Sequence, residues 1–294
     1  MRGLVKSFFG IVFLMLFLLS LALSAVELKL LREDYWTKSL AKSGIYQELT
    51  GKLHQAVAAT FKDFNSQAGQ QLSKLPPDKR REFEKNTAFI TSLEKAGRNI
   101  TADKIQNFAE TNISRLLSFL NGQTTTLFVY VPLTELGVDS KSLQPPFSQL
   151  TAETDAKVFL GAFLKNPDQA IAALHEAQRI VGIAKTVWLG LLAATLLVLV
   201  GFWFLGQDMV GRLKGVSWLL LICGGVSAAM ALGVRGLVTN LLANAANVPP
   251  YAVRLIPDLV NEFFSVGLIV GGVVAGAGLL GVLLLLFFST KKRS

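Results

Sequence analysis

The sequence predicts a mainly α protein with four transmembrane helices and an extracytoplasmic helical-bundle domain that contains a short β element. Of the 294 residues, 51% are hydrophobic and 17% are charged. This composition is too apolar for an ordinary soluble domain and too charged for a bundle of membrane helices alone. Four uncharged apolar stretches are long enough to cross a bilayer. Between the first and the second, a long segment has the periodicity of amphipathic helices.

The first apolar stretch lies at residues 8–26, after Arg2 and Lys6. At about 1.5 Å per residue, it covers the roughly 30 Å hydrocarbon core of a bilayer. Two interpretations of residues 1–26 stay open, a retained anchor or a signal peptide with a small-x-small processing site at Ala22-Leu23-Ser24. The apolar region is longer than the roughly 7–15 residues of a signal peptide, which favours the anchor. Under both interpretations the domain that follows is exported.

The three other spans belong to residues 184–294, at about 186–205, 216–234 and 265–289. Trp188, Trp203 and Trp218 stand near span ends, as an interfacial aromatic belt predicts. The segment 236–264 is apolar but interrupted by three prolines. It is too polar and too broken to cross the membrane, so we expect it to form helices in the outer interface.

The charge distribution predicts the orientation. The exported segment 27–183 is nearly balanced, with 19 Lys and Arg against 17 Asp and Glu. Apart from Lys185, the remaining excess lies in short segments beside the spans, namely Arg2, Lys6, Arg212, Lys214, Lys291, Lys292 and Arg293 against Asp208. Positive residues in short loops stay cytoplasmic. We therefore expect a multi-pass protein of the plasma membrane with cytoplasmic termini, whose basic residues meet anionic lipid and not nucleic acid.

Small residues recur every four positions in the third and fourth spans, a spacing that lets helices pack closely in lipid. The candidate helix-packing residues are Gly225, Ala229 and Gly233 in one span and Gly267, Gly271 and Ala275 in the other. They favour contact between these two spans within one chain. The alternative use of the same faces is association of two copies into a homo-oligomer.

The exported domain, residues 27–183, is predicted to be mainly helical. Thr101 is the expected N-cap of its last bundle helix, and Gly44 and Gly122 are expected to end helices. The expected helices are 34–43, 45–75, 78–96 and 101–122.

One strand is predicted at 124–131, because this segment is rich in aromatic and β-branched residues. A strand needs a partner for its backbone groups, and the sequence leaves two candidates, residues 133–143 or another chain. From Asp168, a helical pattern continues into the second span. That helix is expected to be either a rigid stalk or a helix kinked at Gly182.

The sequence predicts no catalytic, cofactor-binding or metal-binding residues. Its one cysteine, Cys223, lies within an apolar run and excludes a disulfide within one chain. His54 and His175 have no Asp, Glu or His at metal-ligand spacing. Phosphate-binding, G-x-S-x-G and kinase motifs do not occur. We therefore expect a protein that is not an enzyme and has no cofactor.

The chain resembles a family of prokaryotic four-span membrane proteins with an extracytoplasmic helical domain, to which no activity is attached. The resemblance lies in YWTKSLAKSGIYQEL at 35–49, in ITADKIQNFAETNISRLLSFLNGQTTTLFVYVPL at 100–133, and in the order of spans. The expected function is that of a cell-envelope protein that binds an extracytoplasmic partner or senses a condition there. The alternatives are a passive channel or transporter subunit and, with least support, an enzyme that acts on lipid or peptidoglycan.

Overall fold

The computed structural model describes residues 2–72, 76, 94–133, 135–138, 149–243 and 248–291. Almost all of the described secondary structure is helical, in agreement with the predicted fold class. The chain divides into two compact units. The membrane unit comprises Met1–Trp36 and Ile180–Ser294, and the domain unit comprises Thr37–Arg179.

Four long helices confirm the four predicted apolar segments, since each is long and apolar enough to cross a membrane. They are α1 (Arg2–Ala25), α7 (Pro167–Phe204), α8 (Met209–Ala243) and α9 (Pro250–Lys291). A π-helical turn, Val26–Leu30, follows α1. α7 begins in the domain unit and is helical through Gly182, so this glycine does not interrupt it.

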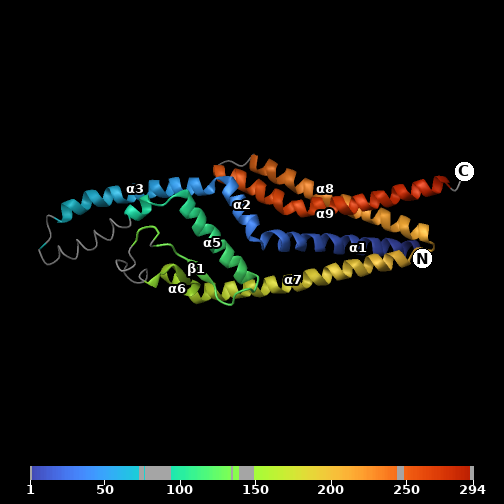
Figure 1. The fold of residues 1–294 in the computed structure, drawn as a ribbon, viewed down its shortest axis with the longest axis horizontal. Coiled ribbons are helices and arrows are strands. Elements are labelled where there is room, and N and C mark those ends of the chain that lie inside the picture. Colours follow the sequence, from blue (N-terminus) through green and yellow to red (C-terminus); the bar gives the residue numbers. More distant parts are fainter. Residues whose placement is uncertain are drawn as a thin grey trace. The chain divides into compact units, whose positions relative to one another are not determined.

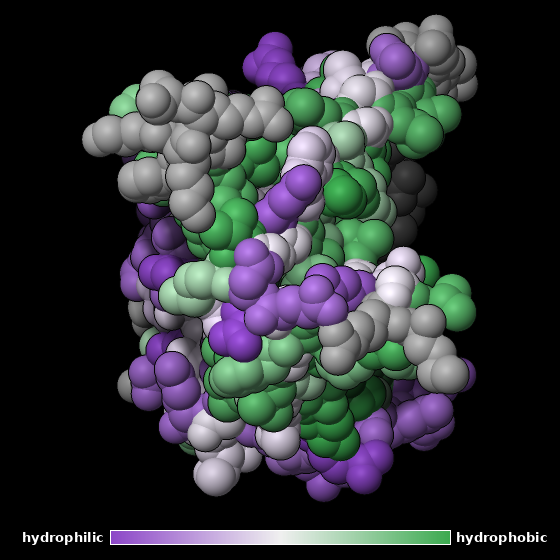
Figure 2. All heavy atoms as spheres, turned by 90° about the vertical axis from the view of Figure 1, so that its right-hand side faces the viewer, coloured by the Kyte–Doolittle hydropathy of each residue, from purple (hydrophilic) through white to green (hydrophobic). Residues whose placement is uncertain are grey.

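Large apolar side chains are exposed along these helices. Leu197 of α7 is 72% exposed, and Val273 of α9 is 69% exposed. Figure 2 shows broad hydrophobic areas on one face of the molecule. Soluble monomers rarely expose contiguous apolar surface on this scale, whereas helices in lipid satisfy their backbones internally and turn apolar side chains outward. The four helices are therefore those of a multi-pass membrane protein.

The membrane unit is held together by two sets of contacts. Phe13 of α1 packs with Leu219 and Cys223 of α8 in a buried cluster, to which α7 contributes Val198, Leu199 and Phe202. α8 and α9 lie side by side and make the most extensive contact between any two elements described (Figure 1). Because lipid tails are as apolar as these side chains, close van der Waals packing holds such helices together.

The segment 236–264 differs from the sequence-based expectation of separate interfacial helices. α8 continues to Ala243, and α9 begins at Pro250, so most of this segment belongs to these two helices. Pro250 suits the first helical position, where its missing N–H is not needed. Pro257 lies inside α9, where membrane helices tolerate proline because neighbouring groups satisfy the freed backbone.

The domain unit contains the rest of the secondary structure. Its elements are α2 (Glu33–Ser43), which begins in the membrane unit, α3 (Ile45–Leu72), α5 (Ala102–Leu120), β1 (Phe128–Tyr130), β2 (Glu153–Asp155) and α6 (Ala156–Phe163). α3 packs on α5, and α5 packs on β1. The predicted helix 78–96 falls mostly on 77–93, outside the described residues; 94–98 are helical.

The predicted helix ends are confirmed at three residues. Gly44 and Gly122 both have φ of 75°, the left-handed conformation that glycine adopts at low cost. The hydroxyl of Thr101 accepts a hydrogen bond from the backbone N–H of Lys104 at 3.3 Å, as an N-cap does. Local sequence signals therefore determine where α2 and α5 end and where α5 begins.

The strand exists, but its partner is a segment that the sequence did not indicate. β1 pairs antiparallel with β2, with Val129 opposite Thr154. The outer edge of β1 is covered by the side chain of Asn112 from α5. The amide Nδ2 of Asn112 donates to Tyr130 O at 3.0 Å, and its Oδ1 accepts from Tyr130 N at 2.8 Å. One side chain thus takes the place of a third strand at Tyr130.

A buried tyrosine should make the domain unit sensitive to alkaline pH. Tyr46 is 2% exposed, and its hydroxyl has no hydrogen-bond partner among the described residues. Burial, and secondly the charge of Glu110, raise the pKa of Tyr46 to about 12. In the unfolded chain a tyrosine titrates near pH ~10, so the unfolded state loses its proton first as the pH rises. This contribution to stability is complete below pH ~10 and is lost towards pH ~12.

Tyr46→Phe should therefore reduce the loss of stability between about pH 9 and about pH 11.5. The measurement is thermal unfolding of the full chain in detergent, followed by circular dichroism at both pH values. An equal fall in Tm for both proteins would show that Tyr46 does not contribute to the alkaline transition.

Candidate functional site

The contact between α8 and α9 is made backbone to backbone at small residues. A Cβ placed on Gly271 would lie 2.9 Å from Gly224 O and 3.2 Å from Ala228 N. A Cβ on Gly224 would lie 2.9 Å from Ala275 Cα. A Cβ on Gly267 would lie 3.4 Å from Ala231 Cβ and 3.3 Å from Leu21 of α1. The three candidate residues of α9, Gly267, Gly271 and Ala275, thus all lie against neighbouring helices.

The candidate residues of α8 lie elsewhere. A Cβ on Gly225 or Gly233 would meet no atom of the described residues within 4 Å, and Ala229 is exposed. α8 approaches α9 through the adjacent stripe of Gly224, Ala228 and Ala231. Successive residues of a helix point in directions about 100° apart. A shift of one position, from Gly225 to Gly224, therefore leads from the exposed stripe to the packed one. Both stripes consist of small residues, and periodicity alone does not distinguish them.

Hydroxyl groups join α1 to α7 within the spans. Ser20 Oγ lies 3.2 Å from Thr195 Oγ1, and both side chains are buried. Trp188 Nε1 donates to Ser24 Oγ at 2.8 Å. Such bonds contribute about 0.6 kcal/mol each on average in membrane helices. The sequence predicted an interfacial position for Trp188, and the structure adds its hydrogen-bond partner.

At one end of the same helices, charged and polar side chains form an ionic cluster. Lys29 of the π-helical turn pairs with Glu262 of α9, and Lys185 of α7 lies 3.7 Å from Glu27. Arg235 of α8 donates from Nε to Asn261 Oδ1 at 2.6 Å. The cluster therefore links the π-helical turn after α1 with α7, α8 and α9 at one level of the membrane unit.

Tyr35 of α2 adds a further bond at this end of the membrane unit. Its hydroxyl donates to Leu259 O of α9 at 2.9 Å. Burial, and secondly the charge of Glu262, raise the pKa of Tyr35, so the phenol remains a neutral donor at physiological pH. Sequence reasoning missed the bond of Tyr35 to Leu259 and the pair of Lys29 with Glu262. The partners in each lie more than 200 residues apart, and no local pattern links them.

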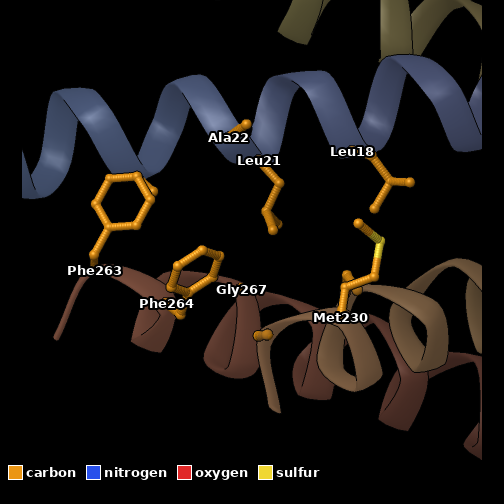
Figure 3. A pocket seen from close by; sticks show the side chains of 10 residues that line it. Leu18, Leu21, Ala22, Met230, Phe263, Phe264 and Gly267 are labelled. Carbon is orange, nitrogen blue, oxygen red and sulfur yellow. The ribbon is translucent and has the colours of Figure 1, made fainter. Parts of the chain in front are cut away.

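Beside this cluster, α1, α8 and α9 enclose an apolar cavity of about 220 Å³ (Figure 3). Figure 3 shows Phe263, Phe264 and Met230 opposite Leu18 and Leu21 of α1. The remaining lining residues are Ala22, Ala25, Ser227, Ala231 and Gly267. Gly267 thus borders the cavity as well as the helix contact. No sequence signal for such a cavity exists, since its lining comes from three different helices.

In the domain unit, a smaller cavity of about 180 Å³ lies beside His175 and Lys157. His175 packs edge-on against Phe119 at 5.3 Å, and Lys157 pairs with Asp168 at 2.7 Å. The other histidine, His54, lies 2.8 Å from Ile100 O through Nε2. Both histidines therefore make structural contacts.

Metal binding finds no support in the described part of the chain. Within it, no group of three or more His, Cys, Asp or Glu side chains is arranged to hold a metal ion. Of the cavities, the one in the membrane unit combines an apolar lining with charged groups at one end. It is the candidate site with the clearest chemistry.

Comparisons with protein-family models, with curated proteins and with solved structures give no match for this chain.

Proposed function

We propose that this chain is a non-enzymatic integral membrane protein of the cell envelope whose exported domain binds a protein partner. In this proposal both termini are cytoplasmic, and residues 27–183 are extracytoplasmic. The proposed function rests on the position of the domain unit in the chain. Thr37–Arg179 forms a compact unit of its own, inserted between α1 and the apolar part of α7. A separately folded domain between two membrane spans is suited to recognition on one side of a membrane.

The proposed orientation rests on the basic residues beside the spans. α7 and α8 are joined by only four residues, 205–208, and Arg212 and Lys214 lie in the first two turns of α8. Arg212 Nε donates to Gly206 O at 3.1 Å, which holds this basic side chain at the turn. Positive residues in such short connections favour the cytoplasmic side.

The proposed partner surface lies at α6, where large apolar side chains are exposed. Phe163 is 61% exposed, Leu164 45% and Val158 39%. Lys165 is also exposed and adjoins them. Grouped apolar side chains on a domain surface are typical of protein contact sites. We therefore place the contact with an extracytoplasmic protein at the C-terminal end of α6, around Phe163 and Leu164.

Single cysteines in a Cys223→Ala background test both parts of the proposal. Lys165→Cys and Gln55→Cys should react in intact cells with a thiol reagent that does not cross membranes, and Met209→Cys should react only after permeabilisation. A photo-crosslinker attached at Lys165→Cys should then give one discrete adduct, absent when Phe163→Ser is added and absent from Gln55→Cys. Labelling of Met209→Cys in intact cells would reverse the orientation. Equal adducts from both domain positions would contradict recognition at α6.

The glycine contact weighs against a passive channel between α8 and α9. Gly224, Gly271 and Gly278 bring the two backbones together, and an added Cβ on Gly278 would lie 2.6 Å from Ser217 O. Backbones at this separation leave no room for a solute between them. The proposal of a partner-binding protein is therefore preferred to the channel alternative.

A further inference from the structure

The cavity between α1, α8 and α9 has a surface that water does not favour. Among the ten described residues that line it, only Ser227 has a polar side chain. The hydroxyl of Ser227 already donates to Gly224 O at 2.9 Å. A buried water needs about two to four polar partners, and apolar cavities without them stay dry. The cavity therefore suits hydrocarbon.

The cavity is also accessible from outside the protein. Met230, which lines it, is 55% exposed, and Ala22 on the opposite helix is exposed as well. Since α1, α8 and α9 are three of the four candidate spans, the surroundings of this opening are lipid tails. A cavity of roughly 150 Å³ is enough to hold a benzene molecule, so about 220 Å³ accommodates a segment of an acyl chain.

One end of the cavity carries an excess of positive charge. Lys29 and Arg235 follow the lining residues Ala25 and Ala231 by four positions, and Glu262 directly precedes Phe263. The ion pair of Lys29 with Glu262 and the bond of Arg235 with Asn261 hold these groups at the same end. In the ionic cluster the three cations Lys29, Lys185 and Arg235 stand against the two carboxylates of Glu27 and Glu262, which leaves one net positive charge. Arg235 uses Nε for Asn261, and its terminal nitrogens suit a phosphate.

We propose that this cavity binds one acyl chain of an anionic phospholipid, with the phosphate at Arg235 and Lys29. The apolar lining receives the chain, and the charged end selects the headgroup. The lipid then fills the space between three helices that would otherwise lack contacts there. This site does not depend on the orientation of the protein or on its protein partner, because the apolar lining and the charged end both belong to the membrane unit.

The test uses the full chain in bilayers of phosphatidylglycerol and phosphatidylcholine. The probe is phosphatidylglycerol with a photoreactive group in its acyl chain, and adducts are located by mass spectrometry of peptides. Adducts should concentrate on the lining residues of α8 and α9, and unlabelled phosphatidylglycerol should compete better than phosphatidylcholine. An even distribution that includes the exposed face of α7 at Leu196 and Leu197 would overturn the proposal.

Two variants test separately the binding of the acyl chain and the recognition of the headgroup. Ala22→Phe places an aromatic ring at the opening of the cavity and should reduce the adducts to the level of the exposed face of α7. Its matched control is Ala229→Phe, an exposed alanine outside the cavity, which should leave them unchanged. Arg235→Gln should lower the preference for phosphatidylglycerol about fivefold and keep the chain adducts. If Ala22→Phe left the adducts unchanged, or if both lipids competed equally with the unmodified protein, the proposal would be wrong.

Discussion

Gly271→Leu should separate α8 from α9 and remove most of the stability of the membrane unit. Even a Cβ at this position would lie 2.9 Å from Gly224 O and 3.2 Å from Ala228 N, both of them backbone atoms. A flexible side chain can move aside, but a helix backbone moves only as a whole. Overpacking in well-packed cores costs about 1–3 kcal/mol, and we expect a cost at or above the upper end of this range.

The buried cysteine provides the measurement. Cys223 is 1% exposed and is the only cysteine in the chain, so its reaction with a thiol-reactive fluorophore reports opening of the helices around α8. In detergent, Gly271→Leu should react at a clearly lower temperature than the unmodified protein. Size-exclusion chromatography of the same samples distinguishes opened monomers from aggregates.

Gly272→Leu is the matched control, since it makes the same change one residue further along α9. A Cβ on Gly272 would meet no atom of the described residues within 4 Å. This variant should therefore react at the same temperature as the unmodified protein. The pair Gly224→Leu and Gly225→Leu should behave in the same way on α8. Equal destabilisation by Gly271→Leu and Gly272→Leu would exclude the packing described for α9.

Which of two neighbouring glycines packs against the other helix could not be predicted from the sequence. Hydropathy and length predicted the four spans, because the lipid environment imposes a strong and local requirement. The choice between Gly224 and Gly225 depends on the rotation of α8 about its axis, which is set by three other helices at once. Two adjacent small residues satisfy the spacing rule equally well, so the rule cannot choose between them.

The same limit applies to the polar contacts and to the cavity. Thr101 and Gly122 could be predicted as helix ends because capping depends on residues within one turn. Lys29 and Glu262 meet across more than 230 positions, and their pairing depends on how α1 and α9 are placed. The cavity beside them is lined by three helices, so it depends on how all three pack together. Contacts of this kind leave no periodic signal along the chain.

The partner of β1 is a third feature that could not be predicted from the sequence. The β-branched and aromatic residues near Phe128 predicted β1, whereas its partner β2 is the short polar sequence Glu153–Asp155. Strand propensity mainly describes the fit of a side chain to a half-buried sheet. Three polar residues on an edge produce no such signal. The pairing is instead supported by groups around it, above all by Asn112 of α5.

Asn112→Ala should weaken the pairing of β1 with β2. The side chain satisfies both backbone groups of Tyr130, at 2.8 and 3.0 Å. Alanine would leave both without this partner, and an unsatisfied, partly buried group costs about 1–3 kcal/mol. Even one or two kcal/mol corresponds to about 5- to 30-fold in an opening equilibrium. The amide hydrogens of Val131 and Ala156, which bond across the pair to Ala152 O and Leu127 O, should exchange faster by this factor.

The measurement is hydrogen–deuterium exchange of the full chain in detergent. It is read out on peptides that cover both strands. Asn107→Ala is the control on the same helix, because Asn107 bonds to two side-chain hydroxyls, donating to Tyr130 at 3.5 Å and accepting from Thr111 at 3.4 Å. Both bonds are long and leave the backbone of β1 untouched, so exchange at Val131 should not change. If both variants accelerated exchange equally, the effect would come from α5 as a whole. If neither did, the strand pair would be stable without its side-chain edge, and Asn112 would not be the group that stabilises it.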